Sequence, residues 1–122
     1  MNFTLSEQQL AIREIAREFA DREFRPYAAE WDEKEILPIE TLRRAAALGF
    51  GGVYVREKVG GSGLGRLDAT LIFEELATGC VSTAAYLSIH NMAAWMIDRF
   101  GNAQQHERFL PKLMTMEHCA SY

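Results

Sequence analysis

The stretch VGGSGLGRLD, residues 59–68, places four glycines within six positions and is the first candidate for nucleotide chemistry. A P-loop carries a lysine and a hydroxyl residue directly after its last glycine, where they reach phosphate and magnesium. The spacing from Gly60 to Gly65 fits that loop, but Arg66 and Leu67 follow it. The dinucleotide-binding fingerprint fails as well, because Arg66 stands where its third glycine belongs. The glycines therefore need another explanation.

Three histidines and one acidic pair are the other groups with acid–base potential. His90, His106 and His118 share no metal-ligand spacing, so no metal site is predicted. Glu74 and Glu75 point about 100° apart on a helix and cannot share one substrate, which favours a solvated face or a local ion pair. His90 lies in an apolar segment and needs a hydrogen-bond partner there, either in the protein or beside a ligand. No catalytic residue is predicted in this chain.

The segment STAAYLSIHNMAAWMIDRFG, residues 82–101, is apolar on almost every side, which predicts a helix at the centre of a bundle. Ala85, Ser88, Ile89 and Met92 share one face of that helix by their spacing. Two small and two adaptable residues could leave a slot between helices. The periodicity alone favours ordinary core packing over such a slot.

The remaining segments predict an all-α fold, an orthogonal or up-down bundle of about six helices. The helix boundaries rest on caps, prolines and glycines. In the first half of the chain, a Thr4–Glu7 capping box opens the first helix, Pro26 and Pro38 mark later helix starts, and Gly49 is a left-handed stop. A helix is predicted over about 67–77, and the central helix then runs from an N-cap at Ser82 or Thr83 to a stop at Gly101. Asn102 with Gln105 starts a further helix, and Pro111 starts or kinks the last one. Residues 118–122 turn β-compatible, which predicts a strand continuing beyond the helical part.

Bulk composition excludes several classes of function. The net charge of −4 is spread along the chain, whereas nucleic-acid binding would show a basic stripe. No apolar run is long enough for a membrane span, and no signal or transit segment is recognisable. Cys80 and Cys119 are expected to be free thiols in a reducing compartment. We expect a bacterial-type cytoplasm, or the mitochondrial matrix in a eukaryote after removal of a transit peptide.

The order of several short motifs resembles the N-terminal helical domain of the acyl-CoA dehydrogenases over essentially all 122 residues. These motifs are LSEQQ at 5–9, EWD at 30–32 after a proline, LG at 48–49, GGSGL at 60–64 and EELA at 74–77. The later stretch LSIHNMAAWMIDRFGNAQQHERFLPKL, followed by ASY, is most similar to the branch of the family that acts on isobutyryl-CoA.

That resemblance implies an enzyme that oxidises an acyl-CoA to the 2-enoyl-CoA, with a glutamate base and FAD as hydride acceptor. It implies homo-oligomers, usually tetramers, that pass electrons to an electron-transfer flavoprotein. Residues 1–117 would be the N-terminal helical domain, and residues 118–122 the start of a middle β-domain. The glutamate and the flavin motif would lie beyond this chain, which is then inactive alone and binds FAD only as part of the parent.

The resemblance also implies roles for particular residues. Ser88, Ile89 and Met92 match positions that line the far end of the acyl pocket, and Tyr122 matches an aromatic residue bordering the flavin. The GGSGL loop becomes a tight connection between helices, with glycines that permit positive φ. The alternative from the residues themselves is a free-standing helical bundle that binds a partner or a small apolar ligand without catalysis.

Overall fold

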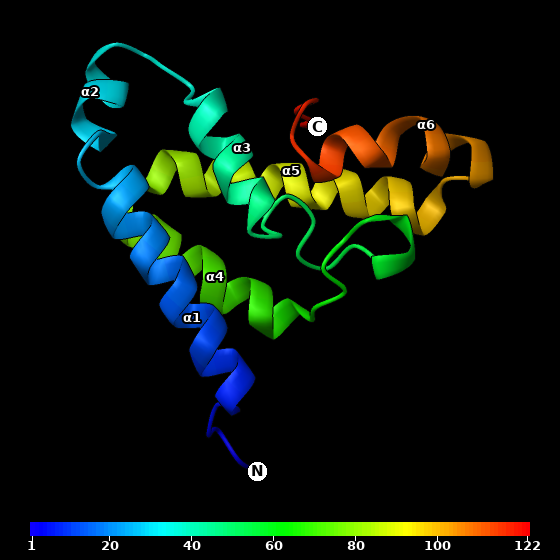
Figure 1. Cartoon of the computed structure of the whole chain (residues 1–122), viewed down its shortest axis with the longest axis horizontal. Helices are drawn as coiled ribbons and strands as arrows, with labels where there is room; N and C mark the ends of the chain where they lie inside the picture. The colour runs from blue at the N-terminus through cyan, green and yellow to red at the C-terminus, as the bar shows by residue number, and fades with distance from the viewer.

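The computed structural model describes residues 1–122 and consists of six α-helices without a β-strand, which confirms the all-α prediction (Figure 1). Helix α1 packs along α4, and α5 packs along α6 (Figure 1). A π-helical turn, Ala20–Phe24, continues α1, and a 3₁₀ turn, Glu57–Val59, interrupts the longest loop. The helices are α1 (Glu7–Phe19), α2 (Ala28–Glu33), α3 (Ile39–Ala47), α4 (Arg66–Gly79), α5 (Val81–Phe100) and α6 (Ala103–Met114).

The N-cap of the first helix is Ser6, two residues after the predicted N-cap Thr4. Ser6 Oγ accepts from the Gln9 backbone N–H at 3.1 Å, and the Gln9 side chain accepts from the Ser6 N–H at 3.0 Å. The Thr4–Glu7 capping box was therefore wrong, although both pairs have the same spacing. The Ser6 cap places Leu5 and Leu10 at the two positions of a hydrophobic staple, whereas the Thr4 cap would place Phe3 opposite the polar Gln8.

One further boundary needed correction, and one was confirmed. Helix α5 starts at Val81 after Cys80, so the predicted Ser82 or Thr83 cap was wrong. The hydroxyl of Thr83 instead lies 3.1 Å from the Cys80 sulfur. Pro111 lies inside α6 and so starts no new helix, while the alternative that it kinks the last helix stays a prediction. The capping box of Asn102 and Gln105 at the start of α6 is present as predicted.

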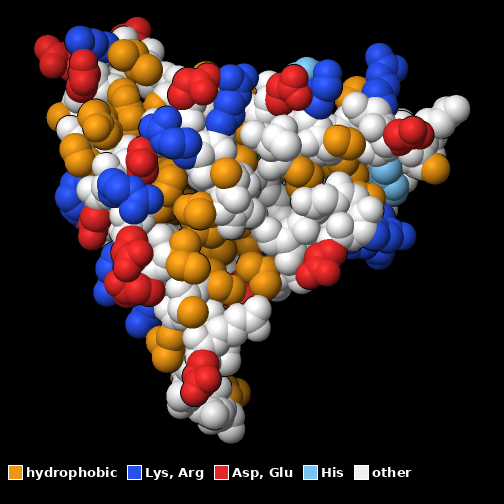
Figure 2. Space-filling model, in the orientation of Figure 1, with side chains coloured by type: hydrophobic (Ala, Val, Ile, Leu, Met, Phe, Trp, Pro, Cys, Tyr) orange, Lys and Arg blue, Asp and Glu red, His pale blue; other side chains and the backbone are white.

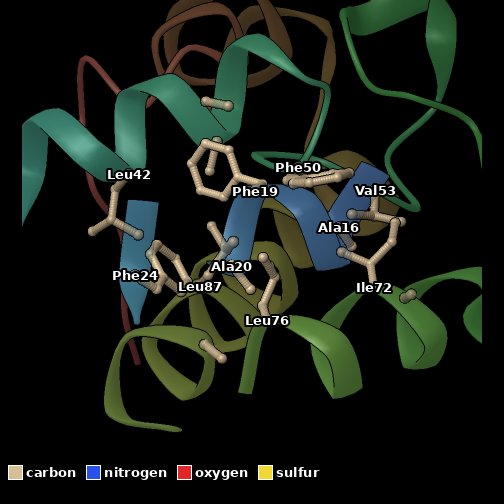
Figure 3. Packing of buried hydrophobic residues seen from close by; sticks show 14 of the residues in the cluster. Ala16, Phe19, Ala20, Phe24, Leu42, Phe50, Val53, Ile72, Leu76 and Leu87 are labelled. Carbon is tan, nitrogen blue, oxygen red and sulfur yellow. The ribbon is translucent and has the colours of Figure 1, made fainter. Parts of the chain in front are cut away.

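The main core lies where α1, α3, α4, α5 and the 50–53 loop meet. Its side chains point toward one another in Figure 3, where Phe19, Phe24, Leu42, Phe50, Val53, Ile72, Leu76 and Leu87 are labelled. Phe19 and Phe24 make an edge-to-face contact with ring centroids 5.4 Å apart. The π-turn between them helps, because its wider spacing brings residues five apart closer to one face.

Charged side chains gather over α1 and along the upper edge of the molecule in Figure 2, with a strip of hydrophobic side chains beside α1. Arg17 of α1 reaches Glu75 of α4 at 2.9 Å, so Glu75 serves in a local ion pair as predicted. Arg44 of α3 similarly reaches Glu23 at 2.9 Å. Such partly exposed pairs contribute only about 0–1 kcal/mol each.

The glycine-rich loop uses its own backbone groups internally. The N–H groups of Gly60, Gly61 and Gly63 donate to the carbonyls of Glu57, Arg56 and Val55 at 3.0, 3.0 and 2.9 Å. They are not free to hold a phosphate, which agrees with the structural assignment of these glycines. Gly60 and Gly63 have φ of 98° and 64°, the left-handed region that favours glycine. Gly61 is required for a different reason, because a Cβ there would overlap the Val55 carbonyl.

Two glycines of this loop make a matched test of that close approach. We expect Gly61→Ala to lower the free energy of unfolding by about 1–3 kcal/mol, since the backbone of Val55 must move. Gly65 has φ of −89°, and a Cβ there would meet nothing closer than Asp68 Oδ2 at 3.4 Å. Gly65→Ala should change stability by less than about 0.5–1 kcal/mol. Urea denaturation of the two variants measures both values, and equal losses would contradict the close-approach argument.

Candidate functional site

The predicted site residues lie on α5, which is buried on one face only. Its buried face carries polar as well as apolar groups, and those residues are Thr83, Ala84, Leu87, His90, Asn91, Ala93, Ala94 and Asp98. Ser88 and Ile89 are half-buried, and Met92 is 38% exposed. The shared face of these three residues therefore points away from the core, and the core-packing interpretation was wrong. A groove between α4 and α5 does include Ala85 and Ser88 of the predicted face, but neither Ile89 nor Met92.

An open groove of about 660 Å³ runs between α4 and α5 beside this outer face. Its lining residues are Thr70, Phe73, Glu74, Ala77, Val81, Ala84, Ala85 and Ser88. Of the three predicted acyl-lining residues, the groove includes only Ser88. The Ser88 hydroxyl donates to the Ala85 carbonyl at 2.7 Å, so its polar group is already partnered. Ser88 therefore contributes a small surface whose hydroxyl already has a hydrogen-bond partner.

Met92 and Tyr122 meet although 30 positions separate them in the chain. The Tyr122 hydroxyl donates to the Met92 sulfur at 3.5 Å, and Tyr122 as a residue is 75% exposed. The structure thus brings together one predicted acyl-lining residue and the predicted flavin-side residue. Ile89 lies one helical turn before Met92 on the same face.

His90 is fully buried and has both ring nitrogens occupied by backbone groups. Its Nε2 lies 2.8 Å from the Leu113 carbonyl, and its Nδ1 accepts from the Ala120 N–H at 3.1 Å. Because Nδ1 must accept, the proton sits on Nε2 and the ring is neutral. Burial lowers the pKa of His90, against the opposing effect of the Leu113 hydrogen bond. Of the two roles left open for His90, the geometry supports the structural one.

Asn91 is also fully buried, and all the polar atoms of its side chain are used. Its Oδ1 accepts from the Val53 N–H at 2.7 Å. Its Nδ2 donates to the carbonyls of Phe50 and Leu87 at 2.8 and 2.9 Å. No buried side-chain nitrogen or oxygen in the structure lacks a hydrogen-bond partner. The polar atoms of Asn91 and His90 therefore need no ligand to satisfy them.

One ion pair of the loop was missed by sequence reasoning. Arg56 donates from Nε to Asp98 at 2.8 Å, and Asp98 is 4% exposed. Burial alone would raise the pKa of Asp98, but hydrogen bonds and charge from Arg56, aided by His106, lower it below its usual value. The available signal was a lone carboxylate inside an apolar helix, which requires a partner.

A stacked arginine next to that ion pair was missed as well. The Arg66 guanidinium lies 3.9 Å from the ring centroid of Tyr54 and 4.6 Å from that of Trp95. These contacts join the start of α4 to the loop and to α5 by cation–π attraction. Together with the Arg56–Asp98 ion pair, they hold residues 54–66 against the C-terminal half of α5.

Three general features of the chain complete this description. No three side chains of His, Cys, Asp or Glu lie close enough together to hold a metal ion. None of the helices has the length and hydropathy needed to cross a membrane. Cys80 and Cys119 are both free thiols. The predicted site residues of α5 lie on its outer side, with the groove beside it.

Comparison with known proteins gives consistent matches along the chain. Residues 6–117 match the family model described as "Acyl-CoA dehydrogenase, N-terminal domain". Mitochondrial isobutyryl-CoA dehydrogenase of Bos taurus is 59% identical over 118 residues, covering 97% of this chain and 28% of the bovine protein.

Two solved structures extend these matches to the fold. A glutaryl-coenzyme A dehydrogenase in complex with glutaryl-CoA has a TM-score of 0.93 at 29% identity, over 98% of this chain and 31% of that one. PigA with FAD and proline has a TM-score of 0.87 at 34% identity, over 94% of this chain and 31% of that one. The chain thus spans less than a third of each of these proteins.

The buried, neutral His90 predicts a pH-dependent stability. Its pKa is lowered in the folded state from 6.5, so below that pH the unfolded chain binds the proton more readily. The free energy of unfolding should therefore fall as the pH drops below about 6.5, by up to about 1.4 kcal/mol per pH unit. His90→Gln removes this contribution and keeps one donor and one acceptor. Urea denaturation at about pH 7.5 and about pH 5.5 measures the free energy of unfolding at both values. Between them it should fall more in the unsubstituted chain than in His90→Gln. Equal decreases in the two proteins would contradict the prediction.

Proposed function

This chain belongs to the acyl-CoA dehydrogenase family as an N-terminal domain, and we propose that it forms the first part of a flavin-dependent enzyme that oxidises a short branched acyl-CoA, such as isobutyryl-CoA, to the 2-enoyl-CoA. The 59% identity to bovine isobutyryl-CoA dehydrogenase over 97% of the chain carries this proposal. Residues 1–117 form the helical domain, and residues 118–122 lead into a middle β-domain. The catalytic base belongs to a later part of the parent, and no residue of this chain is catalytic.

The outer face of α5 is the contribution of this domain to the acyl pocket. Ile89 and Met92 supply apolar surface that excludes water from the end of the acyl group, and their bulk limits its length. Ser88 supplies a small neighbour whose hydroxyl is already bonded to the Ala85 carbonyl. The exposure of Met92 supports this role, because an apolar face left uncovered by its own domain is suited to bind a ligand or another domain.

FAD is the cofactor of the parent protein, where it supplies the hydride acceptor for the oxidation. Tyr122 is the residue of this chain that would border it. This residue is 75% exposed and is free to form one edge of a site that later residues complete. We expect no FAD binding by residues 1–122 alone, because an exposed ring at the last residue is only one wall of a pocket.

The partners of the parent follow from the same family. An electron-transfer flavoprotein accepts the electrons, and the subunits form a homo-oligomer. The enzyme works in a bacterial-type cytoplasm, or in the mitochondrial matrix in a eukaryote. The relative's mitochondrial name supports the latter compartment for a eukaryotic source.

The full-length protein purified from its source gives the direct test of this function. We expect a subunit roughly three to four times the length of this chain, because the chain covers 28% of the bovine relative. It should be yellow, and isobutyryl-CoA should bleach the flavin absorbance under anaerobic conditions. A colourless species of 122 residues would refute the enzyme and leave the non-catalytic helical bundle.

The length of the acyl pocket can be tested at Met92. We expect Met92→Ala in the full-length enzyme to shift the ratio of kcat/KM toward a six-carbon acyl-CoA and away from isobutyryl-CoA. The shift should be about tenfold or more, since one accommodated methylene contributes about 1–3 kcal/mol. Ile15→Ala, an exposed apolar truncation on α1, is the control and should leave the ratio unchanged in a dye-coupled assay. An unchanged ratio in Met92→Ala removes that residue from the pocket.

A further inference from the structure

We propose that His90 and Tyr86 are positioning residues that clamp the backbone of Ala120 and thereby set where Tyr122 lies against the outer face of α5. The acyl-pocket consequence of this clamp rests on the proposed function. The clamp itself rests only on contacts within this chain. Neither residue is expected to touch the substrate.

The two side chains of the clamp bind both polar backbone groups of one residue. His90 Nδ1 accepts from the Ala120 N–H at 3.1 Å, and the Tyr86 hydroxyl donates to the Ala120 carbonyl at 3.3 Å. Residues four apart on a helix share a face, so α5 presents both groups to the same point. Backbone groups usually find such partners within a helix or a sheet, and here α5 side chains replace them.

The His90 ring cannot follow the tail if the tail moves. It is fully buried, and its other nitrogen is held 2.8 Å from the Leu113 carbonyl of α6. The ring is therefore a rigid link from α5 and α6 to Ala120. Tyr86 is half-buried, and burial, together with the nearby Cys119, raises its pKa to about 12, so its hydroxyl keeps the proton that it donates.

The chain reaches Ala120 from a second set of anchors. Arg43 of α3 donates to the carbonyls of Met116 and Glu117 at 3.2 and 3.4 Å. The His118 N–H donates to the Lys112 carbonyl at 3.0 Å. Ala120 is thus the last anchored backbone before the end of the described chain.

Tyr122 lies two residues beyond that last anchor. Two residues span at most about 7 Å, so the position of Ala120 limits where the Tyr122 backbone can lie. Within that range the Tyr122 hydroxyl meets the Met92 sulfur at 3.5 Å. The clamp therefore limits how far the residue assigned to the flavin edge can lie from the residue assigned to the acyl pocket.

Hydrogen exchange at Ala120 in the full-length protein tests the clamp itself. We expect the Ala120 amide to be protected, and Tyr86→Phe to make it exchange about three- to tenfold faster, as the loss of one hydrogen bond allows. His90→Leu removes the acceptor and should abolish the protection, while His90→Gln retains part of it. Tyr27→Phe, at an exposed tyrosine, is the matched control and should leave the Ala120 rate unchanged. An unprotected Ala120 amide, or an unchanged rate in Tyr86→Phe, overturns the clamp.

Kinetics of the full-length enzyme test the positioning role. We expect Tyr86→Phe to raise KM for isobutyryl-CoA several-fold with a smaller change in kcat, and to shift chain-length preference in the direction of Met92→Ala. The two substitutions should combine less than additively, because both act on the contact between Tyr122 and Met92. Tyr27→Phe should match the unsubstituted enzyme.

The two experiments fail in distinguishable ways. A protected Ala120 amide with unchanged kinetics in Tyr86→Phe overturns the positioning role and leaves a purely structural clamp. A full-length protein without flavin or activity on acyl-CoA overturns the proposed function instead, while the exchange rates still report on the clamp.

Discussion

The side-chain amide of Asn91 is the interaction on which the rest of the structure depends. It lies at the centre of α5 and holds the backbone of Phe50 and Val53 from the irregular segment between α3 and α4. That segment has no helix or sheet of its own to satisfy its polar groups there, so a buried amide must do so. Because Phe50 and Val53 belong to the main core, the same hydrogen bonds set how α1, α4 and α5 meet.

Helix α5 consequently has two faces with different tasks. The inner face uses Asn91, His90 and Asp98 to fasten three separate parts of the chain, namely the 50–53 loop, the C-terminal segment and Arg56. The outer face stays free of such bonds to the core and presents Ser88, Ile89 and Met92. A helix that is rigidly held on one side can offer a well-defined surface on the other, which suits the wall of a binding pocket.

Local signals in the sequence were sufficient for much of this fold. The Asn102–Gln105 cap and the turn role of Gly60 and Gly63 follow from residue type and short spacing, and the structure has both. The outward direction of the Met92 face could not be predicted, because periodicity tells which residues share a face but not what lies opposite. The Arg56–Asp98 pair joins positions 42 apart, and no local pattern encodes such a contact.

The π-turn at Ala20–Phe24 sets the rotational phase between α1 and everything that follows it. In a regular α-helix each residue turns the chain by about 100°. Deleting one residue from this turn would restore that regular winding and leave Phe19 and Phe24 four positions apart, a spacing that also places both on one face of an α-helix. It would not change the spacing between Phe24 and Trp31, whose rings lie 6.0 Å apart. The π-turn therefore absorbs one extra residue without separating the Phe19 and Phe24 rings, whose centroids remain 5.4 Å apart.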